Sequence, residues 1–420
     1  MNASNIETFS AVAVPSVNAM PAPTWHRLRV NSEAAPLPEG LELCSESELE
    51  LEGITLGEEG AFDSALTAFQ QKIGTRAAGK ADTRAVVTAA KGQAEAGNLD
   101  VPALSSYQKK AVLEEVSNNV AEAFETGMGP EAYGFLESAA DGHVVLVAEE
   151  GKAGSAIIRL GGQAGFANAA CVDVIAMAGS HASITLSYEG AQDASGFVGC
   201  GIRVFAGVGA EVEVDSIQPL GSSWTVFDDS GYVLDDNAHV VVSHRVLGAE
   251  AAYTGLSADL RGNESRIDVT TRYLGAEQQK RDFNYSIKQR GLATESTLDA
   301  NGVLAGASKK TLRGTIDFVY GCKGSTGNER ESVLLADEGV ENKTVPVILC
   351  DEDDVMGNHG ATIGKLSEET LAYMAARGIP EETAYELMAK ARIHRVCERI
   401  PDEATRQLVE QELEGGNEDE

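Results

Sequence analysis

A thiol, an imidazole and several carboxylates lie close together in the stretch CDEDDVMGNHGATIG, which runs from Cys350 to Gly364. Thiolate and imidazole groups are ligands for zinc and iron, so Cys350 and His359 are candidate ligands of a metal ion or an iron-containing cluster. The same stretch also fits a structural role, in which a last strand from Val347 to Cys350 is followed by an acidic turn. Spacing alone leaves the ligand role open, and it makes Cys350 a weaker candidate than His359.

Two further pairs of residues have side chains that bind metals. His239 and His244 lie five positions apart in HVVVSHRV, which puts them on opposite faces of one strand and argues against a shared metal. His394 and Cys397 lie three positions apart and share one face of a predicted helix, but a metal site needs a third and a fourth ligand. Neither pair is therefore predicted to form a site by itself.

Composition and charge exclude several classes of function. The formal net charge is -32 and no basic stripe interrupts it, which argues against binding to nucleic acid or to an anionic membrane surface. No run of about eighteen apolar residues occurs and the first residues do not resemble an export signal, so we expect a cytoplasmic protein without membrane insertion. No phosphate-binding glycine loop is present, so we expect that this chain itself binds no nucleotide.

The six cysteines are scattered and none is paired as CxxC, so we expect them to be reduced and mostly buried. They are Cys44, Cys171, Cys200, Cys322, Cys350 and Cys397.

These residues lie in three regions that differ in their sequence pattern. Residues 1–135 are predicted to be irregular and then helical, with helical spacing of apolar residues in EEGAFDSALTAFQQKI and in SSYQKKAVLEEVSNNVAEAFETG. Residues 136–362 read as strand after strand, about ten residues apart, with Gly, Asn or Asp at the turns. Residues 363–420 are predicted to form a small helical domain with an acidic tail.

The β-rich region contains no helical pattern of about ten residues, which excludes an alternating βαβ sheet and leaves a sandwich, a propeller or a parallel β-helix. Weak repetition of Gly and Ala favours the β-helix modestly. In the last region, Ser367 can cap a first helix that ends at Gly378, and Pro380 stands where a second helix begins. Pro401 and Asp402 are predicted to open a third helix.

The stretch DDVMGNHGATIGKLSEETLAYMAARGI closely resembles the signature at the end of the SufB/SufD family, which belongs to the Suf machinery for iron–sulfur cluster assembly. The resemblance extends upstream through LLADEGVENKTVPVILC and LRGTIDFVYG, and MPAPTWHRLRVN resembles the N-terminal segment of the family, although residues 40–135 match poorly. It implies a mainly β fold: a right-handed parallel β-helix with an irregular and helical N-terminal region and a small C-terminal α-helical domain.

Details of these motifs are similar to the SufD branch of the family. Gly360 follows His359 where the SufB branch carries Glu, and GVENKTVPV holds no cysteine. By resemblance, His359 corresponds to a histidine at the SufB–SufD interface that is implicated in cluster assembly, whereas the family pattern does not single out Cys350. The sequence departs from the family near Ile267 and in QKRDFNYS, where histidines are common, so roles that rest on those histidines are not carried over.

The resemblance implies a non-catalytic scaffold subunit of a SufBCD-type complex. A SufB-like subunit would pair with the end of the β-helix, where a nascent iron–sulfur cluster would form transiently at the interface. A SufC-like ATPase would dock on the C-terminal helices around Tyr373, Arg377, Gly378 and Ile379.

Two alternatives stay open at this point. The first is a SufB-like homodimer that scaffolds clusters alone, with support from Cys322, Cys350 or Cys397. The second is a cytosolic carbohydrate-active β-helix enzyme, which would use acidic and basic pairs such as Asp268 with Arg272.

Overall fold

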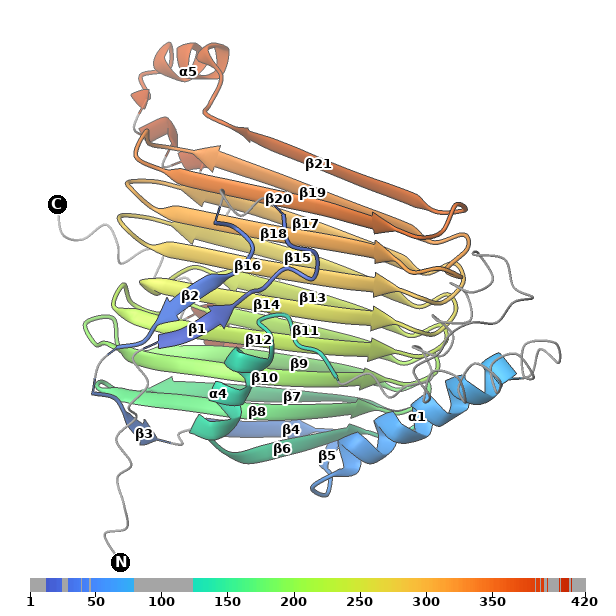
Figure 1. Ribbon diagram of the computed structural model, residues 1–420. Coiled ribbons are helices and arrows are strands. Elements are labelled where there is room, and N and C mark those ends of the chain that lie inside the picture. The colour runs from blue at the N-terminus through green and yellow to red at the C-terminus, as the bar shows by residue number, and fades with distance from the viewer. Residues whose placement is uncertain are drawn as a thin grey trace, which may run out of the picture.

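The structure is a computed structural model that describes residues 13–24, 29–38, 40–44, 47–78, 124–381, 383–385, 387–388, 391, 400, 402–407 and 409, with the side chains of residues 73–78 left out. Most of it is a parallel β-solenoid in which the chain alternates between two sheets (Figure 1). One turn takes about 30 residues, so that Phe197 lies opposite Ala167 of the turn before it. The predicted parallel β-helix is therefore confirmed, although successive strands begin about 15 residues apart rather than ten.

The even-numbered strands of the solenoid form what we call the first sheet, and the odd-numbered strands form the second sheet. The first sheet contains β6 (Ala140–Ala148), β8 (Phe166–Ala176), β10 (Gly196–Ala206), β12 (Trp224–Leu234), β14 (Ala251–Leu260), β16 (Lys280–Gln289), β18 (Lys309–Phe318) and β20 (Glu341–Cys350). The second sheet contains β7 (Ala153–Gly162), β9 (His181–Gly190), β11 (Glu211–Gln218), β13 (His239–Val246), β15 (Arg266–Gly275), β17 (Glu295–Leu304), β19 (Thr326–Leu335) and β21 (Met356–Gly364).

The interior between the two sheets is apolar along most of its length, because in-register parallel strands stack residues of the same face on one another. Val198, Val226 and Ala252 form one such inward-facing stack on successive turns of the first sheet. Burying these aliphatic side chains stabilises each turn against the next, at roughly 25 cal/mol per Å² of apolar surface.

Polar side chains also lie inside the solenoid. The buried Asp228 accepts hydrogen bonds from the hydroxyl of Tyr188 at 3.1 Å, from Nε2 of Gln218 at 3.0 Å and from the hydroxyl of Ser216, and it lies 3.1 Å from Nδ1 of His244. Burial acts most strongly to raise the pKa of Asp228, but His244 and these hydrogen bonds outweigh burial and lower it. Both oxygens of this carboxylate therefore have hydrogen-bond partners within the core.

The two ends of the solenoid differ. At the first turn, β4 (Ser47–Glu52) and β5 (Ile54–Leu56) pair antiparallel with β7 and β6, and β3 (Glu42–Cys44) pairs with β8. The helix α1 (Ala61–Ala78) packs nearby through Phe62 and Phe69. At the last turn, β20 and β21 end the two sheets within the described residues, and no described strand continues either of them (Figure 1).

The outer face of the first sheet is covered by N-terminal elements (Figure 1). β1 (Ala13–Val17), β2 (Glu33–Pro36) and α4 (Pro130–Ala139) pack there in one apolar cluster. Phe135 of α4 makes edge contacts with Phe197 and Phe227, at ring-centroid distances of 5.1 and 5.8 Å. These strands were not predicted from the sequence, while the helix expected in EEGAFDSALTAFQQKI is confirmed as α1.

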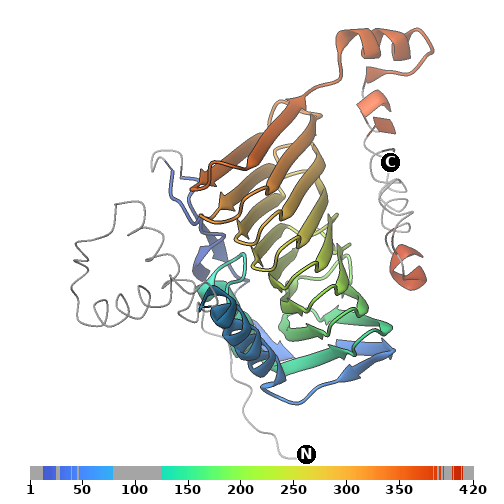
Figure 2. The same ribbon diagram turned by 90° about the vertical axis from the view of Figure 1, so that its right-hand side faces the viewer.

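The C-terminal residues leave β21 and form α5 (Glu368–Ala375), and the described residues that follow α5 lie along the side of the solenoid (Figure 2). Ser367 caps α5, since its hydroxyl accepts a hydrogen bond from the amide of Thr370 at 3.1 Å. Further along, Tyr385 packs in one apolar cluster with Val303 and Leu334 of the solenoid. The Asp402 carboxylate accepts a hydrogen bond from the amide of Thr405 at 2.9 Å, as expected for the start of a third helix, whereas Pro401 lies outside the described residues.

The solenoid continues further along the chain than the sequence indicates. The last strand was expected at Val347–Cys350 with a turn after it, but β20 already begins at Glu341, and His359 lies on a further strand, β21, rather than in a turn. The helix expected in SSYQKKAVLEEVSNNVAEAFETG falls mostly outside the described residues, as do His394 and Cys397. Among the described residues, none of the helices has the length and apolar character needed to cross a membrane.

Candidate functional site at the open end of the solenoid

His359 lies on β21, the last strand of the second sheet, in register with Glu329 of β19. All residues of β21 except Gly364 are exposed, because no further turn covers them in the described part of the chain. Met356 donates its amide hydrogen to the carbonyl of Ser325 on the preceding turn, at 3.0 Å. Since amide directions alternate along a parallel strand, the amides of His359, Ala361 and Ile363 face the open side. These backbone groups beside the imidazole thus have no partner strand among the described residues.

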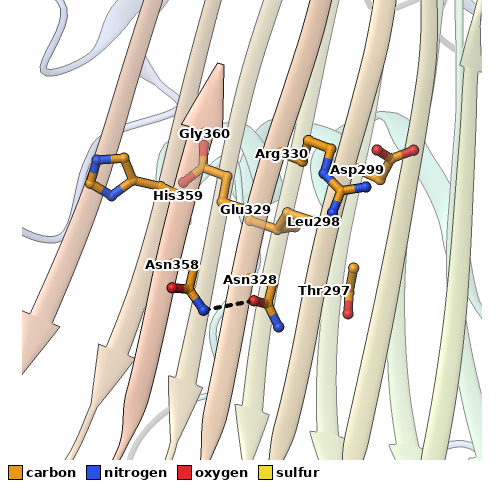
Figure 3. Close-up of a pocket in the computed structure, with 9 residues that line it drawn as sticks. All are labelled: Thr297, Leu298, Asp299, Asn328, Glu329, Arg330, Asn358, His359 and Gly360. Atoms are coloured by element: carbon orange, nitrogen blue, oxygen red, sulfur yellow. Dashed lines mark hydrogen bonds between the residues drawn. The ribbon is translucent and has the colours of Figure 1, made fainter. Parts of the chain in front are cut away.

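A pocket of about 480 Å³ adjoins the imidazole (Figure 3). It lies over the last strands of the second sheet and is lined by Thr297, Leu298, Asp299, Asn328, Glu329, Arg330, Asn358, His359 and Gly360. Asn358 and Asn328 are joined across the strands by an amide hydrogen bond of 3.0 Å. In Figure 3 the imidazole extends past the last strand, and the carboxylate of Glu329 extends towards that strand.

Glu329 stands next to a buried polar network inside the last turns. Lys310 Nζ lies 2.5 Å from Oε1 of Glu331, whose other oxygen accepts a hydrogen bond from the hydroxyl of Thr344 at 2.6 Å. Burial first, and then repulsion from Glu331, raise the pKa of Glu329 to about 7, although Lys310 acts in the opposite direction. Burial lowers the pKa of Lys310 despite its ion pair with Glu331.

Cys350 ends β20 and therefore belongs to the first sheet, whereas His359 belongs to the second. Its thiol is exposed, and Sγ lies 3.1 Å from the carbonyl oxygen of Glu352, to which it donates a hydrogen bond. The described part of the chain contains no group of three or more His, Cys, Asp or Glu side chains placed to hold a metal ion. A cluster ligated by His359 or Cys350 would therefore need ligands from outside the described residues.

Three other thiols are buried, as expected, and are poor ligands in this state. Burial is the main cause that raises the pKa of Cys171 to about 12 and of Cys322 to about 11, and it raises the pKa of Cys200 well above its usual range. Cys44 is partly exposed, and Cys397 lies outside the described residues.

His239 and His244 have separate partners, as the opposite faces of a strand require. His239 Nε2 lies 2.9 Å from Asp268 near the surface, while His244 is buried against Asp228. The pairing of Asp268 with Arg272, on which the carbohydrate-active alternative relied, is wrong. Asp268 pairs with His239 and Arg266, and Arg272 pairs instead with Asp299 of the next turn at 2.7 Å.

The four candidate docking residues gather at the C-terminal end of α5. The guanidinium carbon of Arg377 lies 3.5 Å from the centroid of the Tyr373 ring, and Tyr373 is 59% exposed. Gly378 has φ +80°, a conformation that favours glycine and ends the helix. The amide of Ile379 then donates to the carbonyl of Met374 at 3.1 Å. The whole of α5 contains no buried residue, so this end of the helix is accessible.

Sequence reasoning did not identify Glu329. In the alternating pattern of β19 its charge is typical of a solvated position, and only the buried neighbours Gly327, Glu331 and Val333 show that it faces the interior. The available signal was its separation of 30 positions from His359, the length of one turn of the solenoid. That signal becomes usable once the repeat length is known.

Comparison with known proteins agrees with this architecture. A family model described as "SUF system FeS cluster assembly, SufBD core domain" matches residues 143–392, which is more than half of the chain. The chain is 28% identical to the iron–sulfur cluster assembly protein SufD of Bacillus subtilis over 154 residues, 36% of this chain and 35% of that protein. It is 25% identical to SufB of Bacillus subtilis over 186 residues, 44% of this chain and 40% of that protein.

A chloroplastic SufBD family protein of Arabidopsis thaliana is 24% identical over 226 residues, 51% of this chain and 40% of that protein. The chain thus spans between about a third and two fifths of the length of these three relatives. The family match covers most of the solenoid, the strand that carries His359 and the helix α5. The chain belongs to the SufBD family of iron–sulfur cluster assembly proteins.

Proposed function

We propose that this chain is a SufD-like, non-catalytic scaffold subunit of a SufBCD-type complex that assembles iron–sulfur clusters. The observation that carries the proposal is the exposed last turn of the solenoid, where an imidazole stands beside unpaired backbone groups on β21. The cytoplasmic location expected from the sequence is kept as part of this proposal.

The uncovered ends of the two sheets support pairing with a SufB-like subunit. Exposed edge strands of this length are usually covered or blunted in soluble proteins, because they offer a template for another chain. The first turn is covered by β4 and β5 of the chain itself, whereas β20 and β21 lack such a cover among the described residues. Met356 and Ile363 are 60% and 43% exposed there and would gain from burial against a partner.

The exposed end of α5 supports docking of a SufC-like ATPase. Tyr373 and Arg377 form a stacked aromatic and cationic pair, and such residues often dominate the binding energy of protein interfaces. Gly378 and Ile379 close the helix directly beside them. The SufC-like ATPase would thus bind to helices that contact the solenoid through Tyr385. A conformational change of the ATPase would then be transmitted to the last turn of the solenoid.

The nascent cluster is the cargo of this proposed complex, and His359 would contribute one ligand from this chain. A neutral imidazole is a good ligand for iron, and it is accessible on the uncovered strand. Because the described residues supply no complete ligand set, the remaining ligands would come from the SufB-like subunit. Cys350 is the weaker candidate, since it lies on the other sheet.

Co-expression of the full chain with SufB-like and SufC-like chains tests the proposal. We expect a heteromeric complex that survives size-exclusion chromatography with light scattering and that accepts a cluster during anaerobic reconstitution with iron and sulfide. A chain that remains monomeric beside both partners would contradict it. A stable homodimer that accepts a cluster without a SufB-like chain would instead support the homodimeric scaffold.

A further inference from the structure

Glu329 is a buried carboxyl group that its own chain leaves incompletely satisfied. It is 7% exposed, and its Oε2 atom has no hydrogen-bond partner among the described atoms. Room for it is made by Gly314 on the opposite sheet, where an added Cβ would lie 2.4 Å from Oε1. Burying a carboxyl without partners is costly, so a group outside the described residues is expected to complete this site.

The surrounding charges favour a cation as that group. Two buried carboxyl groups, Glu329 and Glu331, share the last turns with one buried ammonium group, Lys310. Lys310 is already engaged with Glu331 at 2.5 Å, and Glu331 also accepts hydrogen bonds from Tyr273 and Thr344. Among the described residues, Glu329 is therefore left without an ion-pair partner of its own, although Arg330 also lines the pocket.

The imidazole of His359 supplies the second half of such a site. Glu329 and His359 are direct partners on adjacent parallel strands, so their side chains leave the same face about 4.8 Å apart. Both line the pocket of about 480 Å³ at the open end, and Figure 3 shows the carboxylate extending towards the strand that carries the imidazole. Because ligand distances are about 2 Å, a shared ion requires the exposed imidazole to turn back from the position in Figure 3 towards the carboxylate.

We propose that Glu329 and His359 together bind one divalent transition-metal ion of the Fe²⁺ class at the open end of the solenoid. This inference rests on the proposed function, in which His359 is the ligand that this chain offers to iron, and it adds a second ligand. A carboxylate with an imidazole is a common donor pair for Fe²⁺. The other coordination positions stay free for water, sulfide or groups of the partner subunit.

Titration of the untagged full chain with Co²⁺ under anaerobic conditions tests this site, with visible absorption and calorimetry as readouts. We expect one Co²⁺ site per chain, whose affinity falls at least tenfold in Glu329→Gln and in His359→Ala. Gln has the same shape as Glu, and the variant is expected to fold because it removes an uncompensated acid. Glu295→Gln, which changes an exposed carboxylate of the second sheet, is the matched control and should bind Co²⁺ as the wild type does.

Equal Co²⁺ affinity of folded Glu329→Gln and wild type would overturn the inference, and so would the absence of any Co²⁺ site that depends on both residues. A second variant, Glu329→Ala, checks the same residue if circular dichroism shows that the Gln variant is misfolded. A separate measurement, complex formation with SufB-like and SufC-like chains, tests the proposed function. Glu329→Gln should still form the complex with SufB-like and SufC-like chains, whereas loss of complex formation by the wild type would contradict the scaffold role and not the metal site.

Discussion

Glu329 and His359 are direct neighbours in the strand register, yet one is buried and the other is exposed. The reason is their place in the solenoid. β19 is covered by β21, whereas no described strand covers β21. The end of the repeat thus brings the imidazole of His359 to the surface directly beside the polar interior.

The amides that face the open side of β21 give a selective way to test the edge. Ala361→Pro removes one of these amides and leaves the hydrogen bonds to β19 intact, because proline is tolerated on an edge strand. We expect thermal stability close to that of the wild type and binding of the SufB-like subunit weakened at least tenfold. Pull-down with measured affinities, alongside thermal unfolding, checks both.

The matched control for this edge variant is Thr362→Pro, one position along. Its amide faces β19, so this variant should lose a hydrogen bond of the ladder and unfold at a lower temperature than the wild type. Wild-type affinity of Ala361→Pro for the SufB-like subunit would show that pairing does not use this edge.

The ligand role of His359 predicts a specific loss of cluster assembly. His359→Ala should lower the cluster yield of the assembled complex during anaerobic reconstitution, without preventing assembly, because the side chain is exposed and its loss costs little packing. Thr362→Ala, which alters an exposed side chain of the same strand that does not line the pocket, is the control and should keep the yield. An unchanged yield in His359→Ala would remove this residue from the site.

Disrupting the stacked pair at the end of α5 is predicted to weaken binding of the SufC-like ATPase without lowering the stability of the chain. Arg377→Ala should weaken binding of the SufC-like ATPase by about 1 to 2 kcal/mol, as is typical of an interface arginine, and leave the melting temperature unchanged. Lys365→Ala is the control, since Lys365 is also exposed and forms only a surface ion pair with Glu338. Surface plasmon resonance gives the comparison, and equal affinities for the two variants would speak against docking at this site.

A buried ion pair joins two strands of the first sheet, contacts the N-terminal segment, and predicts a large loss of stability when it is broken. Arg313 and Asp282 lie 2.7 Å apart with both side chains fully buried, and Asn18 also donates to Asp282 at 2.7 Å. Arg313→Met leaves the Asp282 charge unpaired and should cost about 3 to 5 kcal/mol in the free energy of unfolding. Lys343→Met, which breaks an exposed ion pair with Glu341, should cost less than about 1 kcal/mol by the same denaturant titration.

Asp229 predicts a defined pH dependence of stability. Burial is the main cause that raises its pKa from 3.8 to about 7 in the folded chain, although Met128 donates its amide to Oδ1 at 2.7 Å. Between these values the folded state holds a proton that the unfolded state has lost, so the contribution of Asp229 to stability falls as pH rises from about 4 to about 7. The total change is on the order of a few kcal/mol.

Asp229→Asn removes this titration. Compared with the wild type, the variant should gain relative stability between pH 5 and pH 8 when unfolding free energies are measured across that range. Parallel stability curves for the two proteins would show that Asp229 has an ordinary pKa in the folded state.

The strands with alternating apolar residues were predictable from the sequence, and those with polar interiors were not. HVVVSHRV reads as a strand and forms β13, whereas β16 and β19 carry Arg281 with Asp282, and Glu329 with Glu331, at buried positions. Such charges break the alternation that identifies a strand. Tertiary contacts, including the ion pairs with Arg313 and Lys310, satisfy most of these charges, and a sequence pattern contains no sign of them.

The candidate site was predictable only in part for a related reason. His359 stood out through its resemblance to a family motif, and the end of the β-helix was the expected place for it. Its strand was missed because MGNHGATIG is rich in small and polar residues, as an uncovered last turn allows. Glu329 was missed because its position next to His359 on the adjacent strand depends on the exact number of residues in one turn of the solenoid.

Hydrogen–deuterium exchange of this chain, alone and with its SufB-like partner, tests the central claim most directly. If the partner pairs with the open end, the amides of residues 356–364 and 341–350 should exchange more slowly in the complex, with the largest change at His359, Ala361 and Ile363. A stable complex in which these amides exchange as fast as in the isolated chain would contradict the account.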